Sequence, residues 1–209
     1  MGKVYIFDHP LIQHKLSIMR CKDTNTKEFR ELLSEIAMLM TYEITRDMET
    51  ELVEVETPIC KASVPMLKKQ PVCLVPILRA GLGMVDAIVQ LLPNAKVGHI
   101  GMYRDEETYQ PVPYYCKLPK EAPSSYVLML EPMNATGGST AAGISVLKEK
   151  GCKNIRVINL IATPQGAQRV HELHPDVDIY IASMDEGLNE NKYIIPGLGD
   201  AGDRIFGTK

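Results

Sequence analysis

The hydrophobic positions of the chain fall into two kinds of segment that alternate along it. Nearly continuous apolar runs lie at 72–78, 96–103, 126–131, 154–162 and 177–182. Between them, apolar residues recur every three or four positions at 84–92, 141–150 and 164–173. The first pattern is typical of strands buried on both faces, and the second is typical of helices. We therefore predict an α/β fold with a mostly parallel twisted sheet and helices on both of its faces.

The segment before residue 72 gives a weaker pattern. Asp8-His9-Pro10 predicts an irregular opening, whereas residues 26–46 predict an amphipathic helix whose apolar stripe belongs either to the core or to a subunit contact. Asn25 and Glu28 stand at the spacing of a capping box at its start. A strand is predicted at 52–57 and a polar loop at 58–69.

The segment after the run at 126–131 has the composition of a phosphate-binding loop. It reads Pro-Met-Asn-Ala-Thr-Gly-Gly-Ser-Thr and leads into the helix predicted at 141–150. A helix N-terminus presents unpaired N–H groups and partial positive charge, and glycines let an anion approach the backbone. Glu131 precedes this loop and would accept hydrogen bonds from sugar hydroxyls. The pair predicts a ribose 5-phosphate site.

The residues of this loop also bear on other interpretations. No Lys follows Gly137 or Gly138, and this loop contains no G-x-G-x-x-G, which excludes the two common nucleotide-binding loops here. An ordinary turn with Ser139 or Thr140 as the helix N-cap is compatible with the same residues, and the loop alone does not decide.

Two further predicted strands end in arginine. Arg79 precedes Ala80-Gly81-Leu82-Gly83, and Arg104 follows the run at 96–103. Because parallel strands bring their carboxyl ends to one edge, we expect both arginines beside the phosphate loop. For Arg79 the alternative is a tight turn with a surface arginine. Residues 105–116 are charged, proline-bounded and tyrosine-rich, which predicts a mobile hairpin or lid. We interpret the acidic triplet in it as an exposed tip and not as a metal site.

The end of the chain has little periodicity but many glycines. Apolar residues at 194, 195, 198, 205 and 206 favour a packed cover over a site and not a floppy terminus. Earlier in the chain, His171 and His174 share one helix face at i, i+3 spacing. Without a third ligand nearby, we interpret both as surface residues and not as metal ligands.

Composition limits the classes of function. A chain of 209 residues that is 45% hydrophobic fits one domain, residues 1–209. A formal net charge of −3 gives no general attraction for nucleic acid. Five scattered cysteines without C-x-x-C spacing indicate neither a disulfide framework nor a zinc site, and fit the cytoplasm. No apolar run is long enough for a membrane span, and the N-terminal residues lack the pattern of a signal peptide.

Several segments together resemble the bacterial uracil phosphoribosyltransferases, which are type I phosphoribosyltransferases. They are VPILRAGLGM at 75–84, GMYRDEET at 101–108, EPMNATGGS at 131–139, GLNE at 187–190 and YIIPGLGDAGDRIFGTK at 193–209. The resemblance covers nearly the whole chain and implies the type I phosphoribosyltransferase fold, with an irregular C-terminal hood formed by residues 185–209. It implies transfer of the 5-phosphoribosyl group of phosphoribosyl pyrophosphate (PRPP) to uracil, giving UMP and diphosphate with Mg²⁺, in pyrimidine salvage.

The resemblance also assigns roles to individual residues. Uracil binding falls to Ile194, Gly199, Asp200 and Ala201. In catalysis Arg79, Arg104 and Glu131 would act by charge and positioning, without a covalent nucleophile. Mg²⁺ would be carried by PRPP, with no protein ligand assigned. PRPP binding falls to Arg79, Arg104, Glu131, Pro132, Met133, Asn134, Ala135, Thr136, Gly137, Gly138, Ser139 and Asp200.

The resemblance has two departures inside the PRPP loop. The family usually has Asp where this chain has Glu131, and Leu where it has Asn134. A homodimer or homotetramer is implied, as is activation by GTP, which occurs in some relatives. Two other functions remain open, a regulator of this fold that binds RNA and an enzyme for another base. The base-binding tail and the low positive charge favour the uracil enzyme over the regulator.

Overall fold

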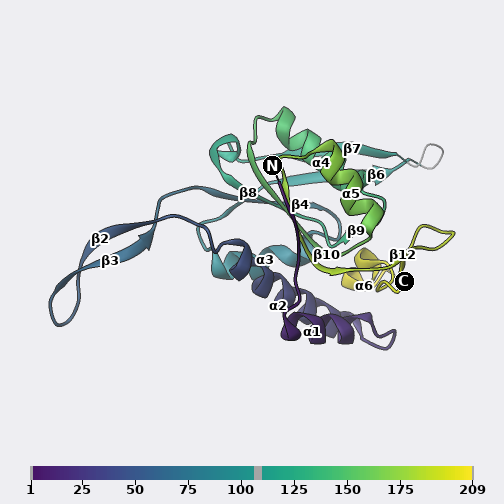
Figure 1. The fold of residues 1–209 in the computed structure, drawn as a ribbon, viewed down its shortest axis with the longest axis horizontal. Helices are drawn as coiled ribbons and strands as arrows, with labels where there is room; N and C mark the ends of the chain where they lie inside the picture. The colour runs from purple at the N-terminus through teal and green to yellow at the C-terminus, as the bar shows by residue number, and fades with distance from the viewer. Residues whose placement is uncertain (1, 106–109, 209) are drawn as a thin grey trace.

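A mixed β-sheet forms the centre of the molecule. The computed structural model describes residues 2–105 and 110–208, and at Arg104 the backbone alone. Along the sheet the strand order is β1-β11-β10-β8-β4-β6-β7 (Figure 1). Every neighbouring pair in this order is parallel except β6 and β7, which confirms the predicted mostly parallel sheet. The strands are β1 (Val4–Ile6), β4 (Val72–Leu78), β6 (His99–Arg104), β7 (Pro111–Lys117), β8 (Tyr126–Leu130), β10 (Asn154–Ala162) and β11 (Asp178–Met184). Short strands β5 (Lys96–Val97) and β9 (Met133–Asn134) pair with β4 and β10.

Helices cover both faces of this sheet, as predicted. On one face lie α1 (Pro10–Arg20), α2 (Thr26–Ile44), α3 (Leu82–Leu91) and the short α6 (Ala201–Phe206) (Figure 1). The other face carries α4 (Gly138–Glu149) and α5 (Pro164–Leu173). A short 3₁₀ turn, η1 (Ala122–Ser124), precedes β8.

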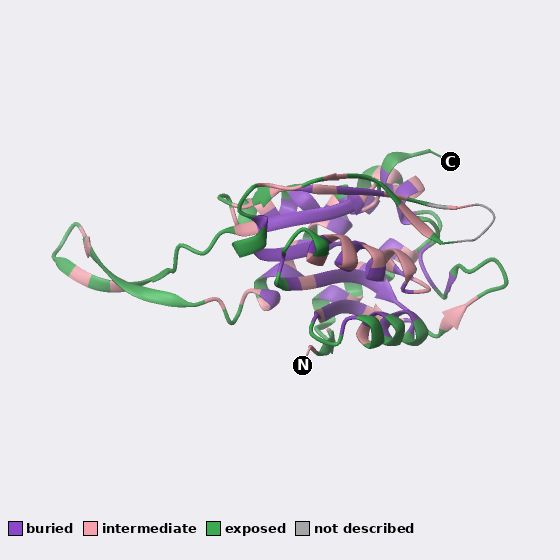
Figure 2. Ribbon diagram, turned by 90° about the horizontal axis from the view of Figure 1, so that it is seen from above, coloured by how far each residue is buried: buried purple, intermediate pink, exposed green. Residues whose placement is uncertain are grey.

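Alternate residues of each central strand enter two separate cores. In β8, Leu128 packs with the core on the α2 side, while Val127 and Met129 pack with the core on the α4 side. All three side chains are fully buried, and the buried interior of the sheet is visible in Figure 2. This two-residue alternation follows from the pleat, and burial on both faces explains why the sequence shows continuous apolar runs.

Several sequence predictions are confirmed closely. The strands at 72–78 and 154–162 and the helix at 164–173 have the predicted bounds. At the start of α2, the Asn25 side-chain oxygen accepts a hydrogen bond from the Glu28 N–H at 3.0 Å. Phe29 and Met40 on the apolar stripe of α2 are fully buried, so the stripe belongs to the core. The helix ends at Ile44 and not at residue 46.

Two predictions before residue 72 are wrong. The segment expected to be irregular from Asp8 onward forms α1, which begins at Pro10, where proline costs no hydrogen bond; the short strand β1 lies just before it. The polar loop expected at 58–69 contains a strand, β3 (Lys61–Leu67), which pairs antiparallel with β2 (Thr50–Glu56). These two strands form an arm that projects from the body of the protein (Figure 1). Most arm residues are exposed, so burial imposes little apolar pattern on either strand.

The tail is mostly packed. After β11 it forms β12 (Gly187–Leu188), β13 (Ile194–Ile195) and α6. Ile194, Leu198 and Ile205 are buried, as predicted, but Ile195 and Phe206 are 43% and 41% exposed. The predicted hairpin after β6 is confirmed by the β6–β7 pairing. Residues 106–109, with two members of the acidic triplet, lie outside the described residues, and a mobile lid stays a prediction.

Candidate active site

The site lies at the topological switch point of the sheet, where the order in which strands are added reverses. From β4 the chain adds β6 on one side and then β8 on the other, so the loops after β4 and β8 diverge. Ligands of open α/β sheets bind in such a crevice at the carboxyl ends of the strands. A cavity of about 260 Å³ opens there, and its walls include Arg79, Glu131, Ser139, Asp200 and Ala201. The structure therefore brings these five predicted site residues together, with Pro132 and Met133 beside them.

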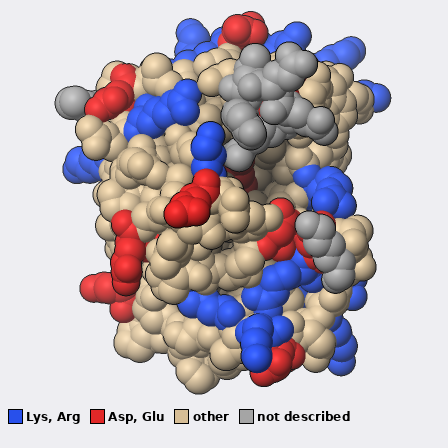
Figure 3. Space-filling model, turned by 90° about the vertical axis from the view of Figure 1, so that its right-hand side faces the viewer, with Lys and Arg blue, Asp and Glu red and all other residues tan. Residues whose placement is uncertain are grey.

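This end of the molecule carries mixed charge. In Figure 3 the basic and acidic side chains of the described residues are interspersed around a hollow and form no continuous basic surface on this face. A larger hollow, of about 430 Å³, lies at the base of the arm and has Leu67 and Val72 among its walls. It is remote from the carboxyl ends of the strands, so the chemistry of the groups, and not cavity size, locates the active site.

The predicted phosphate loop has the backbone geometry of an anion site. Its helix, α4, begins at Gly138, and the N-cap is Gly137 in a left-handed conformation with a φ of 77° and no side-chain cap. The alternative N-caps, Ser139 and Thr140, lie inside the helix, so that assignment of the N-cap is wrong. The first N–H groups of α4 have no intrahelical partner and lie at the positive end of the helix dipole.

The carbonyl groups of the loop are held from the side of β10 and α5. The Pro132 carbonyl accepts from the Leu160 N–H at 2.9 Å, and the Asn134 carbonyl accepts from the Thr163 N–H at 3.1 Å. The Thr163 hydroxyl donates to the Ala135 carbonyl at 2.6 Å. Because these acceptors are already bonded within the protein, the loop is fixed while the N–H groups at the start of α4 stay available to an anion.

The Glu131 carboxylate is positioned by the same helix. Thr140, buried in the first turn of α4, donates its hydroxyl proton to Glu131 Oε2 at 2.5 Å. Glu131 itself is half-buried at the end of β8 and lines the cavity. The Glu131 side chain is therefore held in one place.

A buried pair of amides lies beneath the loop, and sequence reasoning missed half of it. Asn159, in the middle of β10, donates from Nδ2 to the Glu131 carbonyl at 2.6 Å. Asn134 donates from Nδ2 to Asn159 Oδ1 at 3.3 Å, and both side chains are at most 1% exposed. Asn134 is thus directed toward β10, beneath the loop. The available signal was a polar residue inside the apolar run 154–162.

Arg79 and α6 meet at the cavity. Arg79 follows β4, and its Nη2 lies 3.3 Å from Asp203 Oδ1, with the guanidinium 5.9 Å from the centre of the Phe206 ring. The Arg79 side chain is 56% exposed, which leaves it accessible to an anionic ligand. Asp200 caps α6, since its Oδ1 accepts from the Asp203 N–H at 2.8 Å. The backbone of Arg104 ends β6 at the same edge of the sheet, while its side chain is outside the described atoms.

The residues predicted to bind uracil are neighbours but do not all reach one cavity. Asp200 and Ala201 line the cavity described above, and Gly199 lines an adjoining hollow that it shares with Asp200 and Tyr193. Gly199 is left-handed, with a φ of 78°. Ile194, in the tail itself, is buried.

The two histidines at the C-terminal end of α5 were both predicted to be surface residues. His174 is buried, and its Nε2 lies 3.0 Å from the Ala141 carbonyl, so its interpretation as a surface residue is wrong. Burial lowers the pKa of His174. His171 is half-buried. Within residues 2–105 and 110–208, no three His, Cys, Asp or Glu side chains form a group that could hold a metal ion. The same residues contain no helix with the length and apolar character needed to cross a membrane.

Comparisons with known proteins identify the family of the chain. The family model described as uracil phosphoribosyltransferase matches residues 6–208. A uracil phosphoribosyltransferase of Agathobacter rectalis is 60% identical over 209 residues, and one of Clostridium botulinum is 57% identical, each with full coverage of both chains. The solved structure of the AQ2163 protein from Aquifex aeolicus superposes with a TM-score of 0.92 at 38% identity, covering 98% of each chain. The chain therefore belongs to the uracil phosphoribosyltransferase family.

Proposed function

We propose that this protein transfers the 5-phosphoribosyl group of PRPP to uracil, giving UMP and diphosphate in pyrimidine salvage. The observation that carries the proposal is one cavity, at the switch point of the sheet, that combines three features. These are the N-terminus of α4, the carboxylate of Glu131 and the guanidinium of Arg79. They supply a phosphate site, a partner for ribose hydroxyls and a cation for a diphosphate.

In this proposal PRPP spans the cavity. Its 5-phosphate binds the loop Ala135 to Ser139, which precedes and begins α4. The ribose hydroxyls donate to Glu131, and the diphosphate binds Arg79 together with Arg104. The fixed carbonyls of the loop support this placement, because a loop that does not rearrange loses little free energy when it binds an anion.

The reaction follows from where charge develops. The bond from the anomeric carbon to diphosphate breaks, the bond from that carbon to uracil N1 forms, and the N1 proton is lost. Positive charge grows on the ribose, where the Glu131 carboxylate offsets it, and negative charge grows on diphosphate, where Arg79 stabilises it. Positioning and charge therefore account for catalysis, and no covalent intermediate is needed.

Mg²⁺ fits this arrangement as a companion of PRPP. Glu131 and Asp200 bring carboxylate oxygens to the cavity, which are ligands of the kind that Mg²⁺ prefers. Mg²⁺ usually keeps several waters and binds substrate phosphates through few protein ligands. When bound, it would neutralise charge on the leaving diphosphate. We assign no protein residue as its direct ligand.

Uracil recognition is proposed for backbone groups of Ile194, Gly199 and Ala201, with Asp200 at the junction with PRPP. Uracil offers two carbonyl acceptors and an N–H donor, so peptide N–H and C=O groups can match its edge. Cytosine replaces one acceptor by a donor, and sites built on hydrogen bonds reject such analogues by roughly 10⁴-fold. The positive φ of Gly199 favours glycine at this position. Because glycine has no side chain, the backbone there leaves room for a flat base.

A direct assay tests the proposal. Labelled uracil and PRPP should give labelled UMP with Mg²⁺, while cytosine and hypoxanthine should not react. Arg79→Ala should reduce kcat/KM for PRPP by roughly 10²-fold because it removes a cation from the leaving group. UMP formation that is unchanged by Arg79→Ala would contradict the site. RNA binding without UMP formation would instead identify a regulator.

We also propose that the protein is a homo-oligomer. The arm exposes Leu52 and Ile59, at 73% and 91%, and an isolated two-stranded hairpin is at best marginally stable in water. A second copy that covers the arm would stabilise it. Light scattering of the protein with residues 50–67 replaced by a short Gly-Ser linker should then give a lower mass than the parent.

GTP activation rests on the family resemblance and is tested by the rate of UMP formation with and without GTP. Five unpaired cysteines support a cytoplasmic location.

A further inference from the structure

A buried ion pair joins the end of α1 to the tail. Arg20 Nη1 donates to Asp185 Oδ2 at 2.7 Å, and Arg20 Nη2 donates to Asp185 Oδ1 at 2.5 Å. The Asp185 side chain is 2% exposed and that of Arg20 is 21% exposed. Ser183 adds a hydroxyl that donates to Asp185 Oδ1 at 3.1 Å. Paired, two-point contact of this kind fixes both side chains in one orientation.

The ion pair holds Gly197 through both of its backbone polar groups. Arg20 Nη1 donates to the Gly197 carbonyl at 2.7 Å, and the Gly197 N–H donates to Asp185 Oδ2 at 2.9 Å. Gly197 is left-handed, with a φ of 65°, and a side chain there would collide with the Ile194 carbonyl. The conformation of the turn is thus set by charged groups that lie outside it.

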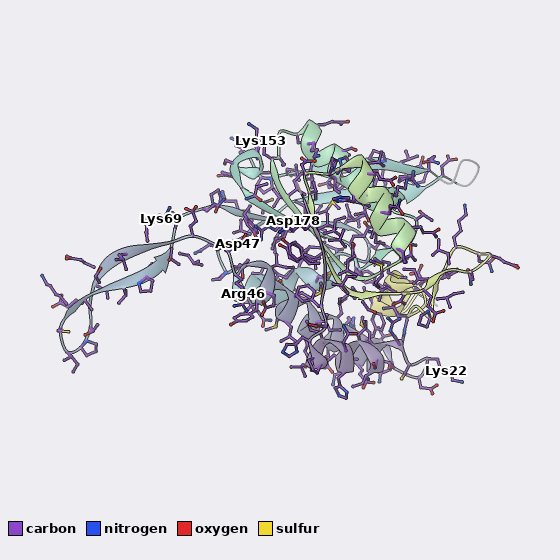
Figure 4. All side chains as sticks on the ribbon, viewed as in Figure 1. Lys22, Arg46, Asp47, Lys69, Lys153 and Asp178 are labelled. Carbon is purple, nitrogen blue, oxygen red and sulfur yellow. The ribbon has the colours of Figure 1, made fainter. Side chains whose placement is uncertain are left out.

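A second arginine, which lies in the tail, also connects the tail to the end of α1. Arg204, on α6, donates to the Leu198 carbonyl at 2.9 Å and to the Met19 carbonyl at 2.7 Å, so it ties the tail to the end of α1. Its guanidinium also lies 4.4 Å from the centre of the Phe29 ring. Two more carbonyls of the α1–α2 turn accept from it, those of Cys21 and Thr24. Figure 4 shows Lys22, in this turn, on the same side of the molecule as the tail.

The held segment runs directly into the proposed base site. Gly197 and Leu198 immediately precede Gly199, Asp200 and Ala201. Neither Arg20 nor Asp185 lines the substrate cavity, so these side chains act on a ligand only through the backbone of the tail. A segment that reads a base through N–H and C=O groups must hold those groups in place to within about 0.5 Å.

We propose that Arg20 and Asp185 are positioning residues for base recognition, and that α1 is therefore a functional part of the uracil site. This inference rests on the proposed function. Loss of the ion pair would let the Gly197 peptide rotate and would shift the following backbone groups, while the PRPP loop, which is anchored to β10 and α5, would stay in place.

The test compares variants of Arg20 with a matched control. Arg20→Gln removes the positive charge, and Arg20→Lys keeps the charge but cannot make the bidentate contact with Asp185. Asp185→Asn keeps the shape of the Asp185 side chain but removes its negative charge. The control is Arg156→Gln. Arg156 also forms an ion pair, 2.6 Å from Asp47 Oδ2, and donates to the Ile44 carbonyl at 2.7 Å, but it lies near the amino end of β10.

Figure 4 marks Asp47 and Asp178, the two acidic partners of Arg156, away from the tail. Arg156→Gln should lower the thermal midpoint without changing the KM of either substrate. A purely structural role of Arg20 would give the same result for Arg20→Gln.

We expect Arg20→Gln to raise the KM for uracil by about 10- to 100-fold and to reduce the preference for uracil over cytosine, with the KM for PRPP within about twofold. Arg20→Lys should lie between the parent and Arg20→Gln. An unchanged KM for uracil, or equal changes in both KM values, would overturn the inference. If Arg20→Gln does not fold, Arg20→Lys and Asp185→Asn decide the question by the change in the KM for uracil relative to the change in the KM for PRPP. If the parent protein does not use uracil but uses another base, only the proposed substrate is refuted. The change in the KM for that base would then be compared with the change in the KM for PRPP.

Discussion

Replacing Asn159 by Leu should destabilise the protein far more than replacing Asn134 by Leu, although the two side chains contact each other. The hydrogen-bond chain has a fixed direction. The Glu131 carbonyl can only accept, so Asn159 must turn Nδ2 toward it and Oδ1 toward Asn134. Asn134 must then donate from Nδ2, and its Oδ1 is left without a hydrogen-bond partner among the described residues.

The magnitudes follow from which buried groups lose their partners. A buried polar group without a partner costs about 1–3 kcal/mol. Asn134→Leu removes the unpaired Asn134 Oδ1 but leaves Asn159 Oδ1 unpaired, so the free energy of unfolding should stay within about 1 kcal/mol of the parent. Asn159→Leu removes the hydrogen bond to the Glu131 carbonyl and the one from Asn134 Nδ2, while Asn134 Oδ1 stays unpaired, a loss of about 2–6 kcal/mol. The double variant loses the hydrogen bond to the Glu131 carbonyl but also removes the unpaired Asn134 Oδ1, so it should return close to the parent.

The assay is urea unfolding of the four proteins at one pH, with thermal midpoints as a second measure. For a chain of this length 1 kcal/mol corresponds to roughly 2–4 °C, so Asn159→Leu should unfold at least roughly 4 °C below the parent. The KM for PRPP should rise in the same variant, because the Glu131 carbonyl anchors the loop. Equal losses in the two single variants, or losses that add in the double variant, would refute the described network.

Three further predictions concern the loop, the carboxylate and the buried histidine. Gly166→Ala would place a Cβ 2.5 Å from the Ala135 carbonyl, so the loop should shift and the KM for PRPP should rise about 10-fold with the KM for uracil unchanged, as steady-state kinetics would show. Glu131→Gln should lower kcat at saturating PRPP by about 10²-fold and Glu131→Asp only mildly; a fully active Gln variant would remove the carboxylate from the ribose. Since burial lowers the pKa of His174, the unfolded chain takes up a proton first as pH falls below about 6.5, and stability declines from there toward the lower pKa of the folded state. His174→Gln should flatten that decline in urea midpoints between pH 7 and 5, and an unchanged slope would contradict it.

The parts of the fold that were predicted correctly are those encoded by local pattern. β4 is buried on both faces, so every position selects an apolar residue and the strand is visible without its neighbours. The cap at Asn25 depends on residues three positions apart. The phosphate loop was recognised for the same reason, since glycines and the helix start are adjacent in sequence.

Features that depend on distant partners were missed. The arm is exposed, so the strand β3 shows no apolar run and is defined by its pairing with β2. Asn159 stands out in its apolar run, but its bond to the Glu131 carbonyl appears only when β8 and β10 are side by side. Thr163 likewise holds a loop that is 28 residues away in sequence.

The pairing of the first strand with one of the last determines when this protein can finish folding during its synthesis. β1 lies beside β11 in the sheet, and Arg20 at the end of α1 is bonded to the tail, so these contacts wait for residues made late in the chain. At roughly 5–20 residues per second the 209 residues take about 10–40 s to make, and throughout most of that time β1 has no partner strand. β10 remains an open sheet edge until β11 emerges, and an open edge invites pairing with other chains. A nascent chain stalled before residue 178 would therefore expose β10 and leave β1 without its partner strand.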